Sequence, residues 1–483
     1  MVSEKFRRQL RQEAETWWQG GLIDAALYEE LSNRYQFRDL ERDASHRFTA
    51  ILIGLGAVLL GLGAITFVAA NWQLWPRGLK ATLLLGSLIG VTALGFYGWQ
   101  RSRFRGYQRL GQGMLLLGAL LLGANLGFMA QMYHRSGQVY ELFLVWGLGV
   151  VLMAYSLRLN LLGVLALILV EIGYWTGWAP WNSGSWQDWS GSHRLIVHMP
   201  LVISLVFVPL AYWCRSQVIF GLSAIALALA LVFNLRPLYF WGNADLTTGW
   251  IAAIALILPP ALLWAYHEQI WQRWPTWNRF QPYQSTLSRF QVISRSLALW
   301  FLAGLFYLFA FHIFWQQAEW TTPANPWQNW EWSPLVDAAI LGGVAILGWL
   351  HLVSSFDRRQ WRERSMNSVT IGSSLIVSAL LFIWHREVGV VAIVAFNLQL
   401  FLLALGLVRD GLALGERGTF WGGMVLLVLG IISRMLEYDT GLLLKSVVFL
   451  LCGLAVILVG LRFERGIRSD HSPILCPSRS EDF

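Results

Sequence analysis

The stretch from Leu110 to Met132 contains no charged residue. An α-helix rises about 1.5 Å per residue, so a run of this length crosses a hydrocarbon core of roughly 30 Å. The sequence therefore predicts a membrane-spanning helix here. A second apolar run follows and ends at Arg158, so the two runs predict a helical hairpin in the membrane. This hairpin restricts the rest of the chain to a membrane fold.

Small residues follow one face of the first helix of this hairpin. Ala119, Gly123 and Gly127 are four residues apart. In lipid, helices associate by close packing rather than by hydrophobic drive, and small side chains allow that approach. The spacing predicts that a neighbouring helix packs closely against this face.

The composition supports a membrane protein. Hydrophobic residues make up 56% of the chain and charged residues 13%, against about 25% in soluble domains. The mean hydropathy is +0.50. A net charge of +8 raises the possibility of nucleic-acid binding, but the basic residues are scattered singly in short connectors. We therefore expect a lipid bilayer as the partner and no nucleic acid.

Apolar runs of spanning length recur along the chain, separated by charges or by Pro, Gly and Asn turns. We expect an all-α polytopic transmembrane helix bundle over residues 49–461, with about fourteen spans and a margin of about two. The first run is too long for the apolar core of a signal peptide and should remain as an anchor. The predicted spans are residues 49–70, 79–99, 110–132, 140–157, 159–178, 195–213, 216–235, 247–266, 295–315, 334–353, 367–384, 388–408, 419–436 and 441–461.

The polar ends of the chain are predicted to lie outside the bundle. Residues 1–48 read as a small cytoplasmic module of two helices, 4–19 and 24–43, broken at Gly20 and Gly21 and capped by Asp24. The module could dock a protein partner or oligomerise, or it could lie as a cap against the first span and touch anionic lipid. Residues 462–483 are expected to form a disordered cytoplasmic tail.

Lys and Arg residues predict the orientation. If the N-terminus is cytoplasmic, 28 of the 36 fall in inside segments, where such residues accumulate. We therefore expect both termini inside. The bacterial inner (plasma) membrane is the expected location, and an internal photosynthetic membrane stays open as an alternative. The sequence does not indicate an oligomeric state.

Two motifs carry a resemblance to a known family. One is LGLGAITFVAANWQLWPRGLK, a Gly-rich span that ends in Ala-Asn-Trp and is followed by Pro and Lys; the other is GANLGFMAQMYHRSGQVYELFLVWGL. With these motifs the chain resembles the DUF2157 family of bacterial integral membrane proteins, a domain of unknown function, over about residues 5–160, with a weaker echo near the C-terminus. The resemblance implies a membrane protein of unassigned activity and supplies no catalytic residue.

Glu171 is the carboxylate that lies deepest within a predicted span. A charge in lipid is costly unless it is paired or hydrated, so such a residue is a candidate functional site. Glu171 shares a helix face with Tyr174, Trp175 and Trp178, which predicts a polar and aromatic path towards the outside. The carboxylate could couple protons or bind a substrate, or it could hydrogen-bond two helices together.

Other polar residues extend the candidate intramembrane site, and Pro259-Pro260 is expected to break its span beside buried amides. Arg434 and Asp439 flank an outer turn and could pair. Outer histidines, including His198 and His312, could bind a metal or sense pH, although interfacial positions explain them as well. The candidate site residues are Glu171, Asn125, Gln131, His134, Asn397 and Gln399.

The sequence contains no recognisable catalytic motif, so we expect no enzyme, no cofactor and no metal. The favoured function is a secondary transporter or flippase-like protein with an outward-facing polar site. The first alternative is a non-transporting scaffold or sensor that recruits partners through residues 1–48. A glycan-handling protein is the third, suggested by the Trp-rich segments 175–194 and 316–333, although an interfacial aromatic belt also explains them.

Overall fold

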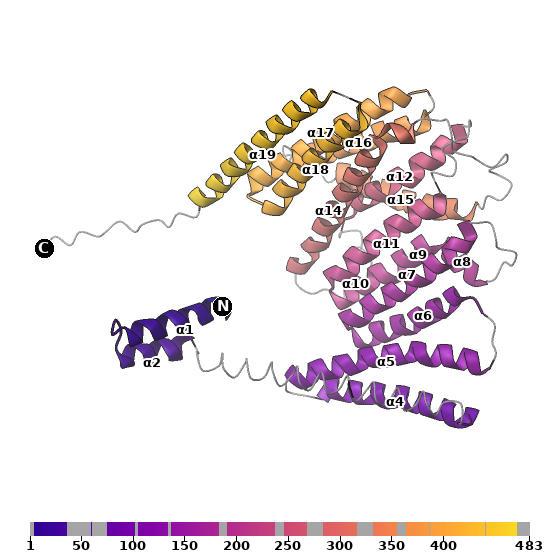
Figure 1. The fold of residues 1–483 in the computed structure, drawn as a ribbon. Coiled ribbons are helices and arrows are strands. Elements are labelled where there is room, and N and C mark those ends of the chain that lie inside the picture. Colours follow the sequence, from indigo (N-terminus) through magenta and orange to yellow (C-terminus); the bar gives the residue numbers. More distant parts are fainter. Residues whose placement is uncertain are drawn as a thin grey trace. The chain divides into compact units, whose positions relative to one another are not determined.

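The computed structural model describes residues 4–35, 59, 75–101, 105–133, 137–182, 191–236, 246–267, 284–315, 332–354, 364–385, 387–439 and 441–470. Every regular element in these ranges is a helix (Figure 1), as the apolar runs predicted. The chain divides into two compact units, Met1–Ser87 and Leu88–Phe483.

The first unit contains a helical hairpin, α1 (Glu4–Gln19) and α2 (Ala25–Tyr35). Gly21 has a φ of +69°, a left-handed conformation that glycine adopts without strain at a helix end. The Leu27 N–H donates to Asp24 Oδ1 over 2.9 Å, which confirms Asp24 as the cap of the second helix. The predicted continuation of α2 to residue 43 lies outside the described residues.

The second unit holds a series of long helices, and α4 (Arg77–Arg101) crosses the boundary between the units. Its elements are α5 (Arg105–Met132), α6 (Val139–Leu157), α7 (Asn160–Asn182), α8 (Gly191–Val197), α9 (Met199–Val202), a π-helical turn (Ile203–Phe207), α10 (Val208–Cys214), α11 (Gln217–Leu235), α12 (Leu246–Ala265), α14 (Gln284–Phe309), a 3₁₀ turn (His312–Phe314), α15 (Ser333–Ser354), α16 (Arg364–Ile383), α17 (Gly389–Leu414), α18 (Arg417–Glu437) and α19 (Leu442–Asp470).

Ten helices in the described ranges are long and apolar enough to cross a membrane. Shorter apolar helices cover Met199–Cys214, Gly249–Ala265 and Ser368–Ile383. The first predicted span, 49–70, lies outside the described residues except for Leu59, so the count of about fourteen stays a prediction. One expectation was wrong: α19 continues to Asp470, so residues 462–470 are helical rather than part of a disordered tail.

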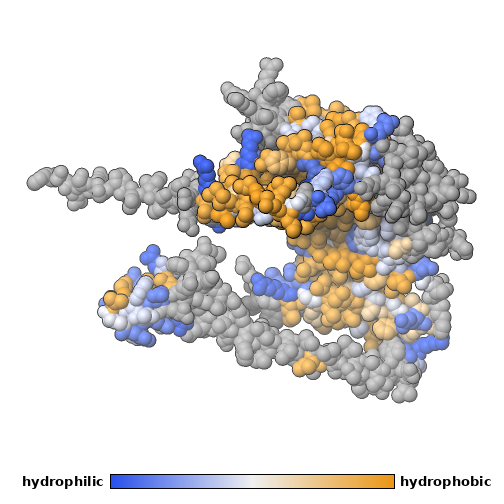
Figure 2. All heavy atoms as spheres, turned by 45° about the horizontal axis from the view of Figure 1, so that its top comes forward, coloured by the Kyte–Doolittle hydropathy of each residue, from blue (hydrophilic) through white to orange (hydrophobic). Residues whose placement is uncertain are grey.

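Packing in the second unit forms two large apolar cores, beside smaller clusters. One large core joins residues of α5, α6, α7, α11, α12, α15 and the segment 196–210, and the other joins residues of α11, α12, α14, α16 and α17. Helix α12 contacts α11, α14, α15 and α16 (Figure 1). Apolar side chains also cover the exterior of the helices (Figure 2); Leu443 on α19, for example, is 81% exposed. An apolar exterior of this kind requires lipid around it.

The small-residue face of α5 packs as predicted. A Cβ built on Gly123 would lie 2.2 Å from Cε2 of Trp146, so the indole of α6 lies directly on the glycine. The same indole N–H donates to the Ala119 carbonyl over 2.7 Å. The absence of a side chain at residue 123 therefore creates the position from which Trp146 ties α6 to α5.

Tryptophans also close helix ends. The last carbonyls of a helix have no partner within it. Trp178 of α7 donates to the Phe233 carbonyl near the end of α11 over 3.3 Å, and Trp213 of α10 donates to the Tyr155 carbonyl near the end of α6 over 2.9 Å. Each of these indoles belongs to a different helix from the one that it caps.

Candidate functional site

Glu171 and Asn125 make their hydrogen bonds within their own helices. The Trp175 indole N–H, one turn further along α7, donates to Glu171 Oε2 over 3.2 Å. The Asn125 amide donates to the Leu121 carbonyl over 2.8 Å. The remaining oxygens, Glu171 Oε1 and Asn125 Oδ1, are buried without a hydrogen-bond partner among the described residues. No described hydrogen bond or ion pair joins the two residues.

The other predicted site residues lie elsewhere. Gln131 is exposed, and His134 lies outside the described residues. On α17, Asn397 Nδ2 donates to the Ile393 carbonyl over 2.8 Å, and Gln399 accepts a 2.9 Å hydrogen bond from the Ser378 hydroxyl of α16. The described contacts therefore place these residues in separate parts of the bundle rather than in one site.

The aromatic face beyond Glu171 is a packing surface. Trp175 and Trp178 both meet the Phe233 ring of α11 edge to face, with centroids 4.8 Å and 5.3 Å apart. Tyr174 is fully buried and donates to Asn234 Oδ1 over 2.8 Å. These side chains join α7 to α11 instead of forming the expected path, and these two tryptophans give no support to glycan handling.

The segment 191–214 is the interrupted span of the described bundle. Pro200 has no N–H with which to bind the Ile196 carbonyl, four residues earlier. The Asn234 amide of α11 binds that carbonyl over 3.2 Å and the Val197 carbonyl over 2.7 Å. A side chain of a neighbouring helix thus satisfies the groups that the break exposes, as a membrane interior requires.

A π-helical turn, Ile203–Phe207, interrupts the same segment a second time. Its Val206 carbonyl accepts a 2.6 Å hydrogen bond from the Tyr155 hydroxyl of α6. Single π turns within α-helices often mark functional positions.

The break predicted at Pro259 and Pro260 was wrong. Helix α12 runs through both prolines as one helix, because they are buried among neighbours that hold the helix in place.

His198 and Asp337 meet at the first interruption. His198 lies between α8 and α9, and its Nδ1 is 2.7 Å from Asp337 Oδ1 in the first turns of α15. Asp337 is fully buried, and its Oδ2 has no hydrogen-bond partner among the described residues. The His198 side chain is 37% exposed. The sequence drew attention to His198 but did not identify its partner, because 139 residues separate the two along the chain.

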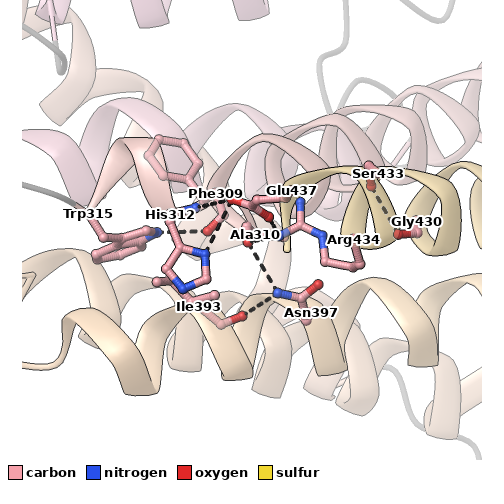
Figure 3. Close-up of polar contacts among 10 residues, drawn as sticks. All are labelled: Phe309, Ala310, His312, Trp315, Ile393, Asn397, Gly430, Ser433, Arg434 and Glu437. Atoms are coloured by element: carbon pink, nitrogen blue, oxygen red, sulfur yellow. Dashed lines mark hydrogen bonds and ion pairs between the residues drawn. The ribbon is translucent and has the colours of Figure 1, made fainter. Parts of the chain in front are cut away.

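A second polar cluster joins the ends of α14 and α18 (Figure 3). Arg434 forms an ion pair with Glu437 and donates through Nη1 to the Ala310 carbonyl just beyond α14. Glu437 Oε1 accepts the His312 backbone N–H over 2.7 Å, and Asn397 binds the Ala310 carbonyl over 3.2 Å. The suggested pairing of Arg434 with Asp439 was wrong, because Glu437 lies one helical turn from Arg434 on the same face.

A metal centre has no support in the described ranges, where no group of three or more His, Cys, Asp or Glu side chains is placed to hold an ion. The imidazoles at residues 198 and 312 face carboxylates instead, at Asp337 and Glu437.

Comparison with known proteins agrees with the sequence motifs. Residues 15–163 match the model of a family described as predicted membrane protein DUF2157. This finding confirms the resemblance for that part of the chain, which includes α5 and α6. His198, Asp337 and Arg434 all lie beyond the matched part. No curated protein and no solved structure matches the chain.

Proposed function

We propose that the chain is a secondary transporter in which the His198–Asp337 pair is the coupling element. The observation that carries the proposal is a fully buried carboxylate bound to an imidazole at an interruption in a membrane helix. Ionisable groups within a membrane are costly and commonly belong to proton or ion pathways. Interrupted helices form the binding sites of many transporters. In this proposal both termini are cytoplasmic, and residues 1–48 form a separate module.

The pair can exist in three net charge states, and it stops being an ion pair when a proton is either added or removed. With a proton on His198 and none on Asp337 it is an ion pair, and with another proton added the carboxyl becomes neutral. A change of one charge alters the attraction between α9 and α15. The unpartnered Asp337 Oδ2 offers a second position for a proton or for a donor group of a substrate. Partial exposure of His198 gives protons access to the pair.

The surrounding backbone is suited to movement. The helix α9 contains four residues and lies between the His198 break and the π-helical turn. Interruptions of this kind concentrate bending at defined positions, whereas a continuous helix resists it. A change in the charge of the pair could therefore tilt α9 while α11, which binds the end of α8 through Asn234, stays in place.

Hydrogen–deuterium exchange of the full chain in nanodiscs tests the proposal, because it needs no known substrate. Exchange in residues 191–214, corrected for the intrinsic effect of pH, is expected to change between mildly acidic and mildly alkaline buffer. Asp337→Asn keeps the size and hydrogen-bonding shape of the side chain but cannot ionise, so the change should be lost. Corrected wild-type exchange that is the same at every pH would contradict the proposal.

Glu171→Gln provides the matched control. Glu171 is also a carboxylate with one buried, unpartnered oxygen, but its hydrogen bond stays within α7. The control variant should keep the response to pH in residues 191–214. If both variants lose it, the effect belongs to the general electrostatics of the bundle and not to the pair.

A second candidate function is partner recruitment, because the α1–α2 hairpin exposes apolar side chains around its turn. Trp18 is 48% exposed, Leu22 77% and Leu27 45%. Such a patch is typical of an interaction surface. A photo-crosslinking residue at position 22 should then give one discrete protein adduct in cells. The additional substitution Trp18→Ser should reduce the yield of that adduct. Adducts to lipid alone would instead indicate that the hairpin lies as a cap on the membrane surface.

A further inference from the structure

A cavity of about 320 Å³ lies among α17, α18 and α19. It is lined mainly by apolar side chains, including Leu400, Leu426 and Val448, and it has Asn397 and Arg434 as polar members. Its volume is at the lower end of the range for small-molecule sites. The cavity belongs to neither the His198–Asp337 pair nor the segment around it.

Among the described residues, the Arg434 guanidinium makes its polar contacts through one of its three nitrogens, and its Cζ lies over the Phe311 ring, 4.2 Å from the centroid. Nη1 contacts both the Ala310 carbonyl and Glu437, whereas Nε and Nη2 are buried without a partner among the described residues. Nε and Nη2 share one edge of the planar guanidinium and present parallel N–H groups. This edge matches the two oxygens of a phosphate or carboxylate. Buried charged donors left unpaired are costly, so an acceptor there would stabilise the site.

The position favours a lipid over a soluble anion. Arg434 lies three residues before the end of α18, about 4.5 Å along the helix axis. Lipid headgroups meet the acyl chains near the ends of spanning helices, and arginines near those ends commonly reach that level. A soluble anion would find a largely apolar wall, whereas a lipid would place its chain against that wall. The neighbouring face of α19 exposes Leu450 by 71%, which suits contact with the bilayer.

We propose that this cavity binds one membrane phospholipid, with its phosphate on the Nε–Nη2 edge of Arg434 and an acyl chain along the apolar lining. Asn397 provides a further polar group in the wall. Glu437 holds the opposite end of the guanidinium, so it fixes the orientation of the free edge. The bound lipid would fill the space among α17, α18 and α19 and hold α19 to its neighbours.

Native mass spectrometry of the full chain in detergent tests this site, with phosphatidylglycerol and the fatty acid palmitate as separate probes. The wild type is expected to retain one phosphatidylglycerol in preference to palmitate. Arg434→Gln should weaken its retention about tenfold or more, as the loss of a bidentate charged contact predicts. Arg434→Lys, which keeps the charge but not the planar edge, should also weaken it.

Val448→Trp fills the cavity and leaves residue 434 unsubstituted, so it keeps the test decisive if the arginine variants fail to fold. It should reduce lipid retention, whereas Arg158→Gln, at an arginine whose guanidinium lies over the Trp213 ring, should not. Retention unchanged by Val448→Trp, or no retention by the wild type, overturns the proposal. Preference for palmitate overturns the assignment to a phospholipid.

Discussion

The side-chain amide of Asn234 on α11 lies 2.7 Å from the carbonyl oxygen of Val197, the last residue of α8, and so satisfies a backbone group of another helix. Its Oδ1 accepts a hydrogen bond from the Tyr174 hydroxyl, and its amide also donates to the Ile196 carbonyl, so three hydrogen bonds depend on Asn234. Asn234→Leu should lower the free energy of unfolding by several kcal/mol, because each buried polar group left unpaired costs about 1–3 kcal/mol. Thermal or denaturant unfolding in detergent micelles measures the effect.

Asn125→Leu is the control for that measurement. The Asn125 amide binds only its own helix, and Oδ1 is buried without a partner among the described residues. Its replacement by an apolar residue of similar size should be neutral or stabilising. Equal losses of stability in the two variants would show that the location of Asn234 at the interrupted helix is unimportant.

Gly123→Ala should destabilise the α5–α6 hairpin. The new Cβ would collide with the Trp146 indole, which must move and lose its hydrogen bond to Ala119. Overpacking of this kind typically costs about 1–3 kcal/mol. Gly113→Ala on the same helix is the matched control, because nothing lies within 4 Å of its added Cβ. The prediction fails if the two variants have the same melting temperature.

Glu171→Leu should leave stability unchanged or raise it. The substitution removes a buried oxygen that has no partner among the described residues and loses only the 3.2 Å contact with Trp175. An apolar side chain is preferred at such a position in lipid. A large fall in the melting temperature would reveal a structural hydrogen bond that the described contacts do not include. Normal stability with a deletion-like phenotype in cells would return Glu171 to the functional candidates.

The α1–α2 hairpin should lose stability at alkaline pH. Burial, followed by the negative charge and hydrogen bond of Glu15, raises the pKa of the Tyr28 phenol above its ordinary value. Since the fold favours the neutral phenol, this contribution is complete below the unfolded pKa and is lost as pH rises through the folded one. NMR of ring-labelled tyrosine, assigned with Tyr28→Phe, measures the pKa. Glu15→Gln should lower it towards the ordinary value; an unchanged pKa would exclude Glu15 as a cause.

Much of the fold could be predicted because its determinants are local. The first helix has the predicted bounds, Glu4–Gln19, and α11 begins one residue after the predicted start of its span. Uncharged runs, glycines and capping residues act within a few positions of the chain, so their consequences can be read from it. The close approach of α5 and α6 was likewise predictable from the spacing of small residues.

The polar contacts could not be predicted in the same way. Each predicted site residue was a plausible buried group, but hydrogen-bond partners depend on which helices pack together. Asp337 and His198 illustrate this point, since neither has a local feature that identifies the other. Pro259 and Pro260 looked like a break, yet the interruption formed at Pro200, where Asn234 could bind the freed carbonyls. Tertiary packing selects among several positions that the sequence allows.

Capping by tryptophans of other helices has a consequence for how such a chain can evolve. The end of α11 depends on Trp178 of α7, and the end of α6 depends on Trp213 of α10. Deleting one helical hairpin would therefore fray a helix that remains. The indole of tryptophan reaches these carbonyls through an N–H that phenylalanine lacks, so even this aromatic exchange would shorten a neighbour. Homologous chains should gain or lose these helices in interdependent sets rather than one at a time.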